Sequence, residues 1–135
     1  MKKFILFSLL LLTTNLLNAA EAGKKSYRAV IDKDGVQRVV LVGGSYFFDP
    51  AHIIVKVNVP VELSVRKESG MLPHNIVVKA VNAGIDFDEE MGSEPKIIRF
   101  TPTKTGSYPM YCSKKFLFFE SHREKGMEGV LEVEE

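Results

Sequence analysis

The chain has 135 residues, of which 45% are hydrophobic and 26% are charged, and its formal net charge is +1. Removal of residues 1–20, which include Lys2 and Lys3 but no acidic residue, would change that charge to −1. A near-neutral chain is a poor fit to nucleic-acid binding, which requires a basic face to neutralise phosphates. The roughly 115 remaining residues suffice for one domain with a single core and are too few for two.

Residues 1–20 have the pattern of a secretory signal peptide. "MKK" is a basic start, "FILFSLLLL" is an apolar run, and "LLNAAEA" offers small residues where a signal peptidase cuts. We expect cleavage between residues 20 and 22, which leaves a single domain over 21–135 in a bacterial periplasm, without stable membrane insertion. The alternative is a retained anchor, although the apolar run is short for a transmembrane helix.

Short runs rich in β-branched residues predict an all-β domain of seven to eight strands. "DKDG" predicts a tight hairpin turn between the first two runs, because its glycine supplies a positive φ, and it lacks the further ligands of a calcium loop. The pattern is typical of a β-sandwich or barrel. The predicted strands cover residues 27–31, 36–42, 52–59, 61–67, 74–81, 96–101, 106–112 and 129–135.

Two segments between these runs are predicted to be irregular or helical. "NAGIDFDEEMGSEP", residues 82–95, is predicted to be a long loop, and its acidic residues are interpreted as solvated side chains, with cation binding as the alternative. The segment 113–125 has features of a short helix, with Ser113 as its cap and Gly126 at its end. The acidic residues of the loop are Asp86, Asp88, Glu89 and Glu90.

Four residues with metal-binding side chains are predicted to converge at one end of the sandwich. His74 begins a predicted strand, Cys112 ends another, and His122 and Met127 lie in the segment that returns to the last strand. Two imidazoles, a thiolate and a weak thioether suit copper, whereas zinc prefers four strong ligands and rarely uses a thioether. His52 has no such neighbours and is interpreted as a residue at the edge of a strand.

Each of these residues also has a purely structural interpretation. Taken singly, His74 would be a hydrogen-bonded strand residue, Cys112 and Met127 would fill the core, and His122 would be solvated. A cysteine–histidine hydrolase is a further alternative, but no motif marks an oxyanion hole and Met127 would have no role. The combination of all four residues favours a metal site.

Two motifs resemble those of the cupredoxins, the small secreted blue-copper proteins, most closely the plastocyanin-like branch. "LPHNIVV" resembles the strand of the first ligand, and "GSYPMYCS" with "HREKGMEGVLEV" resembles the second motif. The resemblance implies an eight-stranded Greek-key sandwich and one copper ion, Cu(I) or Cu(II), bound by His74, Cys112, His122 and Met127. It further implies that Asn75 connects the ligand loops by hydrogen bonds.

The chain departs from the plastocyanin-like pattern in one place. Nine residues, "SKKFLFFES", separate Cys112 from His122, where two are typical of that branch. The longer tether is expected to hold His122 less firmly unless the phenylalanines pack against it. We expect "FLFF" to cover the end of the sandwich or the metal, and the alternative is an exposed patch where an electron-transfer partner docks.

The sequence thus predicts a monomeric, non-enzymatic carrier of single electrons that works with redox protein partners. The alternatives are a protein that delivers or sequesters copper with the same ligands, and a sandwich module that has lost its metal.

Overall fold

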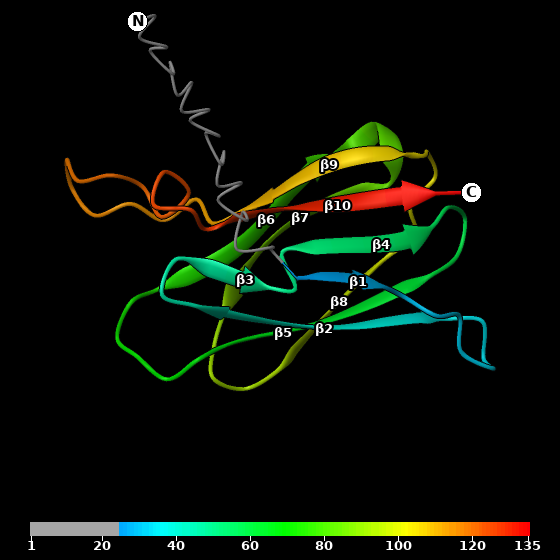
Figure 1. Ribbon diagram of the computed structural model, residues 1–135, viewed down its shortest axis with the longest axis horizontal. Helices are drawn as coiled ribbons and strands as arrows, with labels where there is room; N and C mark the ends of the chain where they lie inside the picture. Colours follow the sequence, from blue (N-terminus) through cyan, green and yellow to red (C-terminus); the bar gives the residue numbers. More distant parts are fainter. Residues whose placement is uncertain (1–24) are drawn as a thin grey trace, which may run out of the picture.

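The computed structural model describes residues 25–135, which form two β-sheets packed face to face (Figure 1). The expected signal peptide, residues 1–20, lies outside the described residues. The larger sheet has six strands in the order β1-β4-β10-β9-β6-β7. Its strands are β1 (Ser26–Arg28), β4 (His52–Lys56), β6 (His74–Ala80), β7 (Ile85–Met91), β9 (Gly106–Tyr111) and β10 (Glu128–Glu134).

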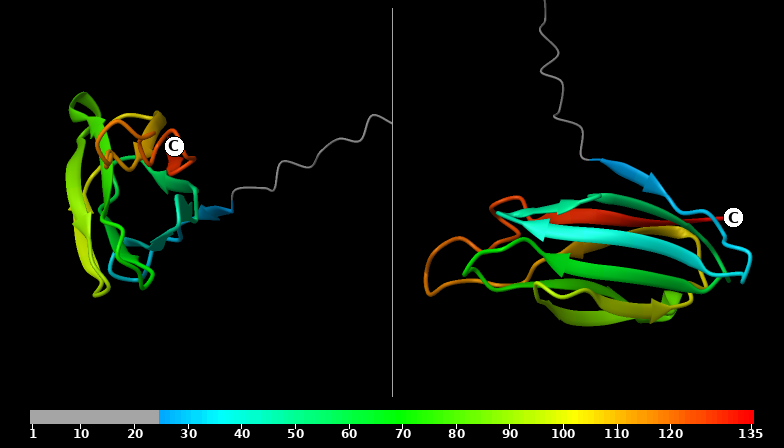
Figure 2. Two further views of the ribbon diagram at one scale, coloured as in Figure 1. Left: turned by 90° about the vertical axis from the view of Figure 1, so that its left-hand side faces the viewer. Right: turned by 90° about the horizontal axis from the view of Figure 1, so that it is seen from below.

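The smaller sheet has four strands in the order β3-β2-β5-β8. Strand β2 pairs in parallel with β5, and β4 pairs in parallel with β10, so the chain repeatedly crosses from one sheet to the other (Figure 2). A single 3-10 turn, η1 (Val81–Ala83), connects β6 and β7. The strands of the smaller sheet are β2 (Gln37–Gly44), β3 (Phe47–Asp49), β5 (Val61–Lys67) and β8 (Lys96–Phe100).

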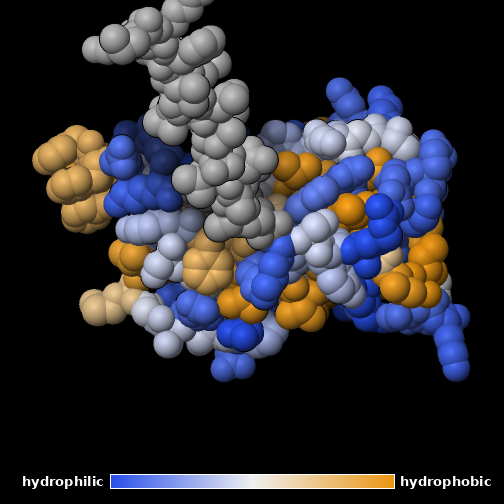
Figure 3. Space-filling model, in the orientation of Figure 1, coloured by the Kyte–Doolittle hydropathy of each residue, from blue (hydrophilic) through white to orange (hydrophobic). Residues whose placement is uncertain are grey.

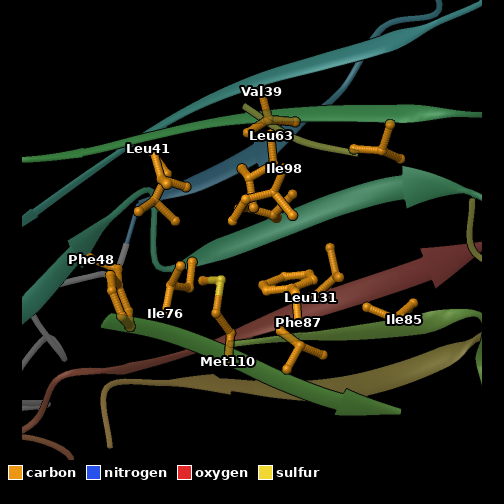
Figure 4. Close-up of a cluster of buried hydrophobic side chains, with 14 of the residues drawn as sticks. Val39, Leu41, Phe48, Leu63, Ile76, Ile85, Phe87, Ile98, Met110 and Leu131 are labelled. Atoms are coloured by element: carbon orange, nitrogen blue, oxygen red, sulfur yellow. The ribbon is translucent and has the colours of Figure 1, made fainter. Parts of the chain in front are cut away.

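The core lies between the two sheets and follows the alternation in the sequence. In β10, Leu131 and Val133 are buried and alternate with the half-buried Glu132 and Glu134, because successive side chains of a strand point to opposite faces. The core side chains drawn in Figure 4 come from both sheets and meet in the middle. The predicted β-sandwich is therefore confirmed.

The predicted hairpin around "DKDG" is present only as a turn. Gly35 has a φ of 80°, as a tight turn requires, and a single antiparallel bridge joins Ile31 to Gln37. Strand β1 then pairs with β4 in the larger sheet, whereas β2 belongs to the smaller sheet. A local turn signal does not determine the sheet to which each flanking strand belongs.

The predicted acidic loop over residues 82–95 is wrong in its central part, which forms β7. Ile85, Phe87 and Met91 are buried on one face of the strand, and Asp86, Asp88 and Glu90 alternate with them on the other, so the segment has a two-residue period. Glu89 lies on the inner side and is half-buried. The acidic side chains have partners on the sandwich. Lys79 pairs with Asp86, Lys96 with Glu89 and Lys114 with Glu90, and Asp88 accepts a hydrogen bond from Asn75.

One end of the sandwich gathers the segments that carry the candidate ligands. Strand β6 begins there, β9 ends there, and the connection from β9 to β10 projects from the same end (Figure 1). Among residues 25–135, no helix is long and apolar enough to cross a membrane.

Candidate metal centre

The structure brings three of the predicted ligands together. His74 is the first residue of β6, Cys112 directly follows β9, and His122 lies in the connection between β9 and β10. Within the described part of the chain, these three residues form the one cluster of His, Cys, Asp or Glu side chains with the spacing of a metal site. All three are buried, with at most 5% of their surface exposed.

The three ligand atoms form a compact triangle. The Nδ1 atoms of His74 and His122 are 3.1 Å apart, and Cys112 Sγ lies 4.0 Å from the first and 3.5 Å from the second. A triangle with these sides has a circumradius of about 2.1 Å, and metal–nitrogen and metal–sulfur bonds are about 2.0 to 2.3 Å long. A single ion in the plane of the triangle therefore fits all three atoms.

The protonation state of both imidazoles suits metal binding. Burial lowers the pKa of His74, and repulsion from Lys67 and from a protonated His122 would lower it further. Burial also lowers the pKa of His122, with Lys125 and Lys114 acting in the same direction. Both rings are therefore neutral near pH 7, and a neutral imidazole nitrogen is the form that binds a metal.

Met127 lies beside the cluster and is fully buried. Its backbone N–H donates to the carbonyl of His122 at 2.9 Å, and its carbonyl accepts from the N–H of Cys112 at 3.0 Å. The methyl carbons of Met127 and Met91 both approach Gly43 on β2, where any added Cβ would lie 3.2 Å and 2.9 Å from them. Gly43 thus leaves room for two thioether side chains at this end of the core.

Asn75 connects the two ligand segments, as the resemblance implies. Its buried side chain accepts a hydrogen bond from the N–H of Ser113 and donates from Nδ2 to Ser113 Oγ, both at 2.8 Å. Nδ2 also donates to Asp88 on β7 at 2.8 Å. Because Asn75 follows His74 and Ser113 follows Cys112, these bonds fix the spacing between two of the three ligands.

The long connection between Cys112 and His122 is held by polar contacts. The N–H of His122 donates to the carbonyl of Lys114 at 2.8 Å, which closes the connection at its base. Ser121 and Glu124 form a reciprocal capping box, in which the Glu124 N–H donates to Ser121 Oγ and the Ser121 N–H donates to the Glu124 carboxylate. These bonds fix the backbone on both sides of His122.

Two expectations for this connection are wrong. Residues 113–125 form turns and no helix, and the cap residue is Ser121 in place of Ser113. The side chains of Phe116, Leu117, Phe118 and Phe119 are exposed, so they neither cover the metal site nor pack against His122. The helix signals are overridden because the backbone bond from His122 to Lys114 closes this segment into a loop.

Tyr46, in the turn between β2 and β3, covers the imidazoles and was not predicted from the sequence. Its ring meets His122 edge-on at 5.0 Å between centroids and His74 at 6.4 Å, and Lys125 Nζ lies over the same ring, 4.6 Å from its centroid. Its position depends on the distance between two sheets, which no local motif encodes. His52 lies away from this cluster at the start of β4, where its Nε2 pairs with Glu132 at 2.7 Å.

Comparison with known proteins supports the fold. No family model matches the chain, and no curated protein matches its sequence. Among solved structures, the metal-binding domain of the Cu(I)-exporting P-type ATPase CopA of Streptococcus pneumoniae D39, solved with Cu(I), has a TM-score of 0.64 at 22% identity. That match covers 84% of this chain and 99% of the domain.

Two further structures show the same fold. Auracyanin A, a blue copper protein from Chloroflexus aurantiacus, has a TM-score of 0.53 at 20% identity, over 74% of this chain and all of its own. A multicopper oxidase has a TM-score of 0.61 at 14% identity, over 82% of this chain and 47% of its own. The chain therefore has the cupredoxin fold, and the resemblance drawn from its motifs is confirmed at that level.

Proposed function

We propose that the protein binds one copper ion and carries single electrons. His74, Cys112 and His122 would hold the ion in a plane, with Met127 as a weak fourth ligand. The observation that carries this proposal is the buried triangle of two neutral imidazole nitrogens and one sulfur, with a size that fits one ion. A His/His/Cys plane with a distant thioether is the ligand set of blue-copper sites.

The surrounding residues support electron transfer without conversion of a substrate. Copper in such a site supplies a one-electron couple between Cu(I) and Cu(II). The hydrogen bonds of Asn75 and the bond from the His122 N–H to the Lys114 carbonyl hold the ligands in place. The ligands would therefore move little when the charge of the bound ion changes. Tyr46 and the core shield the ligand atoms from water.

The cellular setting is part of the same proposal. The signal-like residues 1–20 support export to a periplasm, where redox proteins would donate and accept the electron and the protein would act as a monomer. The sequence pattern of that segment is the support for export.

A second function, copper delivery or sequestration, has one observation in its favour. A surface pocket next to the site is lined by His74 and by residues 67–72, which include the fully exposed thioether of Met71. Methionine sulfur is a soft ligand that suits Cu(I), so this pocket offers a route for exchange of the ion.

One experiment separates these functions. The protein over residues 21–135 is loaded with Cu(II), and we expect an intense visible charge-transfer band that a reductant abolishes and an oxidant restores. Cys112→Ser should lose the band, whereas His52→Gln should keep it. A colourless loaded protein, or equal copper affinity in Cys112→Ser, would contradict the electron-transfer proposal. Rapid loss of copper to a chelator would favour delivery.

A further inference from the structure

The tip of the connection between β9 and β10 is a cluster of exposed apolar side chains, residues 116–119. Phe116, Leu117, Phe118 and Phe119 are 66%, 68%, 86% and 51% exposed. The connection projects from the end of the sandwich, and an apolar cluster stands out there in the space-filling view (Figure 3). Four consecutive bulky apolar residues at a projecting tip are unlike the singly scattered apolar residues of an ordinary surface.

These side chains do not contribute to the core or to the metal site. Phe119 stacks on Phe118 and on Phe116, with ring centroids 5.0 Å and 6.1 Å apart, and none of the four residues belongs to the buried core cluster. The polar bonds at Lys114, Ser121 and Glu124 hold the base of the connection without the aromatic rings.

The backbone at the tip gives a second, independent observation. Leu117 has a φ of 48°, in the left-handed region that favours glycine or asparagine. A leucine there costs conformational energy, and its exposure costs solubility. Glycine or asparagine at position 117 would form the same turn at a lower conformational cost. The turn therefore does not account for the leucine, and we attribute its side chain to a role in binding.

The connection that carries the tip is basic overall, with Lys115 directly before residues 116–119 and Glu120 directly after them. The connection 113–126 holds four basic and two acidic residues, a formal charge of +2, whereas the other described residues hold 11 basic and 14 acidic, a formal charge of −3. Lys115 lies directly beside Phe116. Lys114 and Arg123 pair with Glu90 and Glu128, but such exposed pairs are weak and can exchange for a phosphate.

We propose that residues 116–119 insert into the interface of an anionic phospholipid bilayer, with the neighbouring Lys and Arg side chains at the lipid phosphates. A convex apolar tip needs no complementary socket in a fluid bilayer, and the local positive charge complements anionic headgroups. Contact with the bilayer would place the end of the sandwich that holds His122 against the membrane. This inference does not depend on the identity of the metal.

The chain contains no tryptophan, which allows a single reporter to be introduced. Phe118→Trp is mixed with vesicles of phosphatidylglycerol and phosphatidylcholine in equal parts, and with vesicles of phosphatidylcholine alone. We expect a blue shift of the tryptophan emission with the anionic vesicles and a much smaller shift with the neutral ones. The matched control is Val40→Trp, an exposed apolar position on β2, which should show no shift.

A second measurement removes the apolar tip. The double variant Phe116→Ser, Phe118→Ser should lose at least about tenfold in vesicle affinity in a sedimentation assay, because two large apolar side chains no longer insert. Its thermal midpoint and its copper-dependent absorption should stay unchanged, since the tip is remote from the core.

Three results would overturn the proposal. The unaltered protein could stay in the supernatant with anionic vesicles, or the two tryptophan variants could respond alike. Alternatively, the protein could form concentration-dependent dimers that the double serine variant abolishes, in which case the tip is an interface between copies of the chain.

Discussion

Asn75 shows how a single side chain can fix the spacing of two ligands. It is buried and bonds both the N–H and the hydroxyl of Ser113, next to Cys112. Replacement by alanine removes the three hydrogen bonds that this buried side chain makes to Ser113 and Asp88, which together contribute about 1 to 3 kcal/mol. We therefore expect Asn75→Ala to lower the free energy of unfolding by that amount, measured by urea denaturation of the metal-free protein.

The control for this prediction is Asn82→Ala in the exposed turn η1, which should change the free energy of unfolding by less than about 0.5 kcal/mol. Equal effects of the two variants would contradict the role of Asn75.

Met127 can be tested as the weak fourth ligand of the proposed copper site. Met127→Leu keeps the volume of the side chain but removes a donor that favours Cu(II), so the reduction potential should rise while the visible band persists. Cyclic voltammetry of the copper-loaded protein measures the change. Met91→Leu, at the other thioether beside Gly43, is the matched control and should leave the potential unchanged. An unchanged potential in Met127→Leu would show that its sulfur is not bound.

Sequence and structure differ at the residue scale in an instructive way. His74, Cys112 and His122 could be predicted because each side chain carries its own chemistry and lies where a strand or a connection ends. Tyr46 and Gly43 could not, because their roles arise from where β2 lies relative to the other sheet. A tyrosine in a turn or a glycine in a strand can have many roles, and its role here depends on how the two sheets pack.

At the scale of elements, the connection between β9 and β10 compensates for its length with local bonds. Lengthening a loop by a factor of two costs only about 0.6 kcal/mol in closure entropy, so the difficulty is geometric. The capping box of Ser121 and Glu124 and the bond from His122 to Lys114 supply that geometry. The extra residues therefore project beyond the bond between Lys114 and His122, and they do not loosen the hold on His122.

The capping box leads to a prediction for this element. Ser121→Ala removes the oxygen that accepts the Glu124 N–H, so the turn that carries His122 should open more often. We expect faster transfer of copper to a competing chelator, followed by stopped-flow absorption. Ser93→Ala, in an exposed connection between β7 and β8, should leave the rate unchanged, and an equal rate in both variants would contradict the prediction.

Strand β7 is the part of the fold that could not be predicted from the sequence. A run of β-branched residues predicted β5 and alternation in "VLEV" predicted β10, yet the acidic residues of β7 resembled a loop because aspartate and glutamate are rare in strands. Strand β7 tolerates them because the acidic residues of its outer face meet Lys79, Lys114 and Asn75. Glu89, on the inner side, pairs with Lys96 at the edge of the other sheet. Such pairing partners lie on other segments of the chain and are invisible to a local pattern.

For the whole molecule, the proposed site ties together segments that are far apart in sequence. His74 begins β6, and Cys112 and His122 follow β9, so a bound ion crosslinks the folded chain and is absent from the unfolded one. Binding to the native state alone adds about 4 kcal/mol to the free energy of unfolding when the ligand is a thousandfold above its Kd. For a domain of this size, that corresponds to a rise in Tm of at least about 10 °C.

We therefore expect copper-loaded protein to melt at least about 10 °C above the metal-free protein in differential scanning calorimetry. Cys112→Ser should lose most of this rise, because the ion then keeps only two of the three ligands in the plane. His52→Gln should keep the full rise, because His52 bonds Glu132 on β10 and lies outside the triangle. An equal rise in all three proteins would show that copper binds elsewhere on the surface, and no rise in any of them would show that the triangle does not hold the ion.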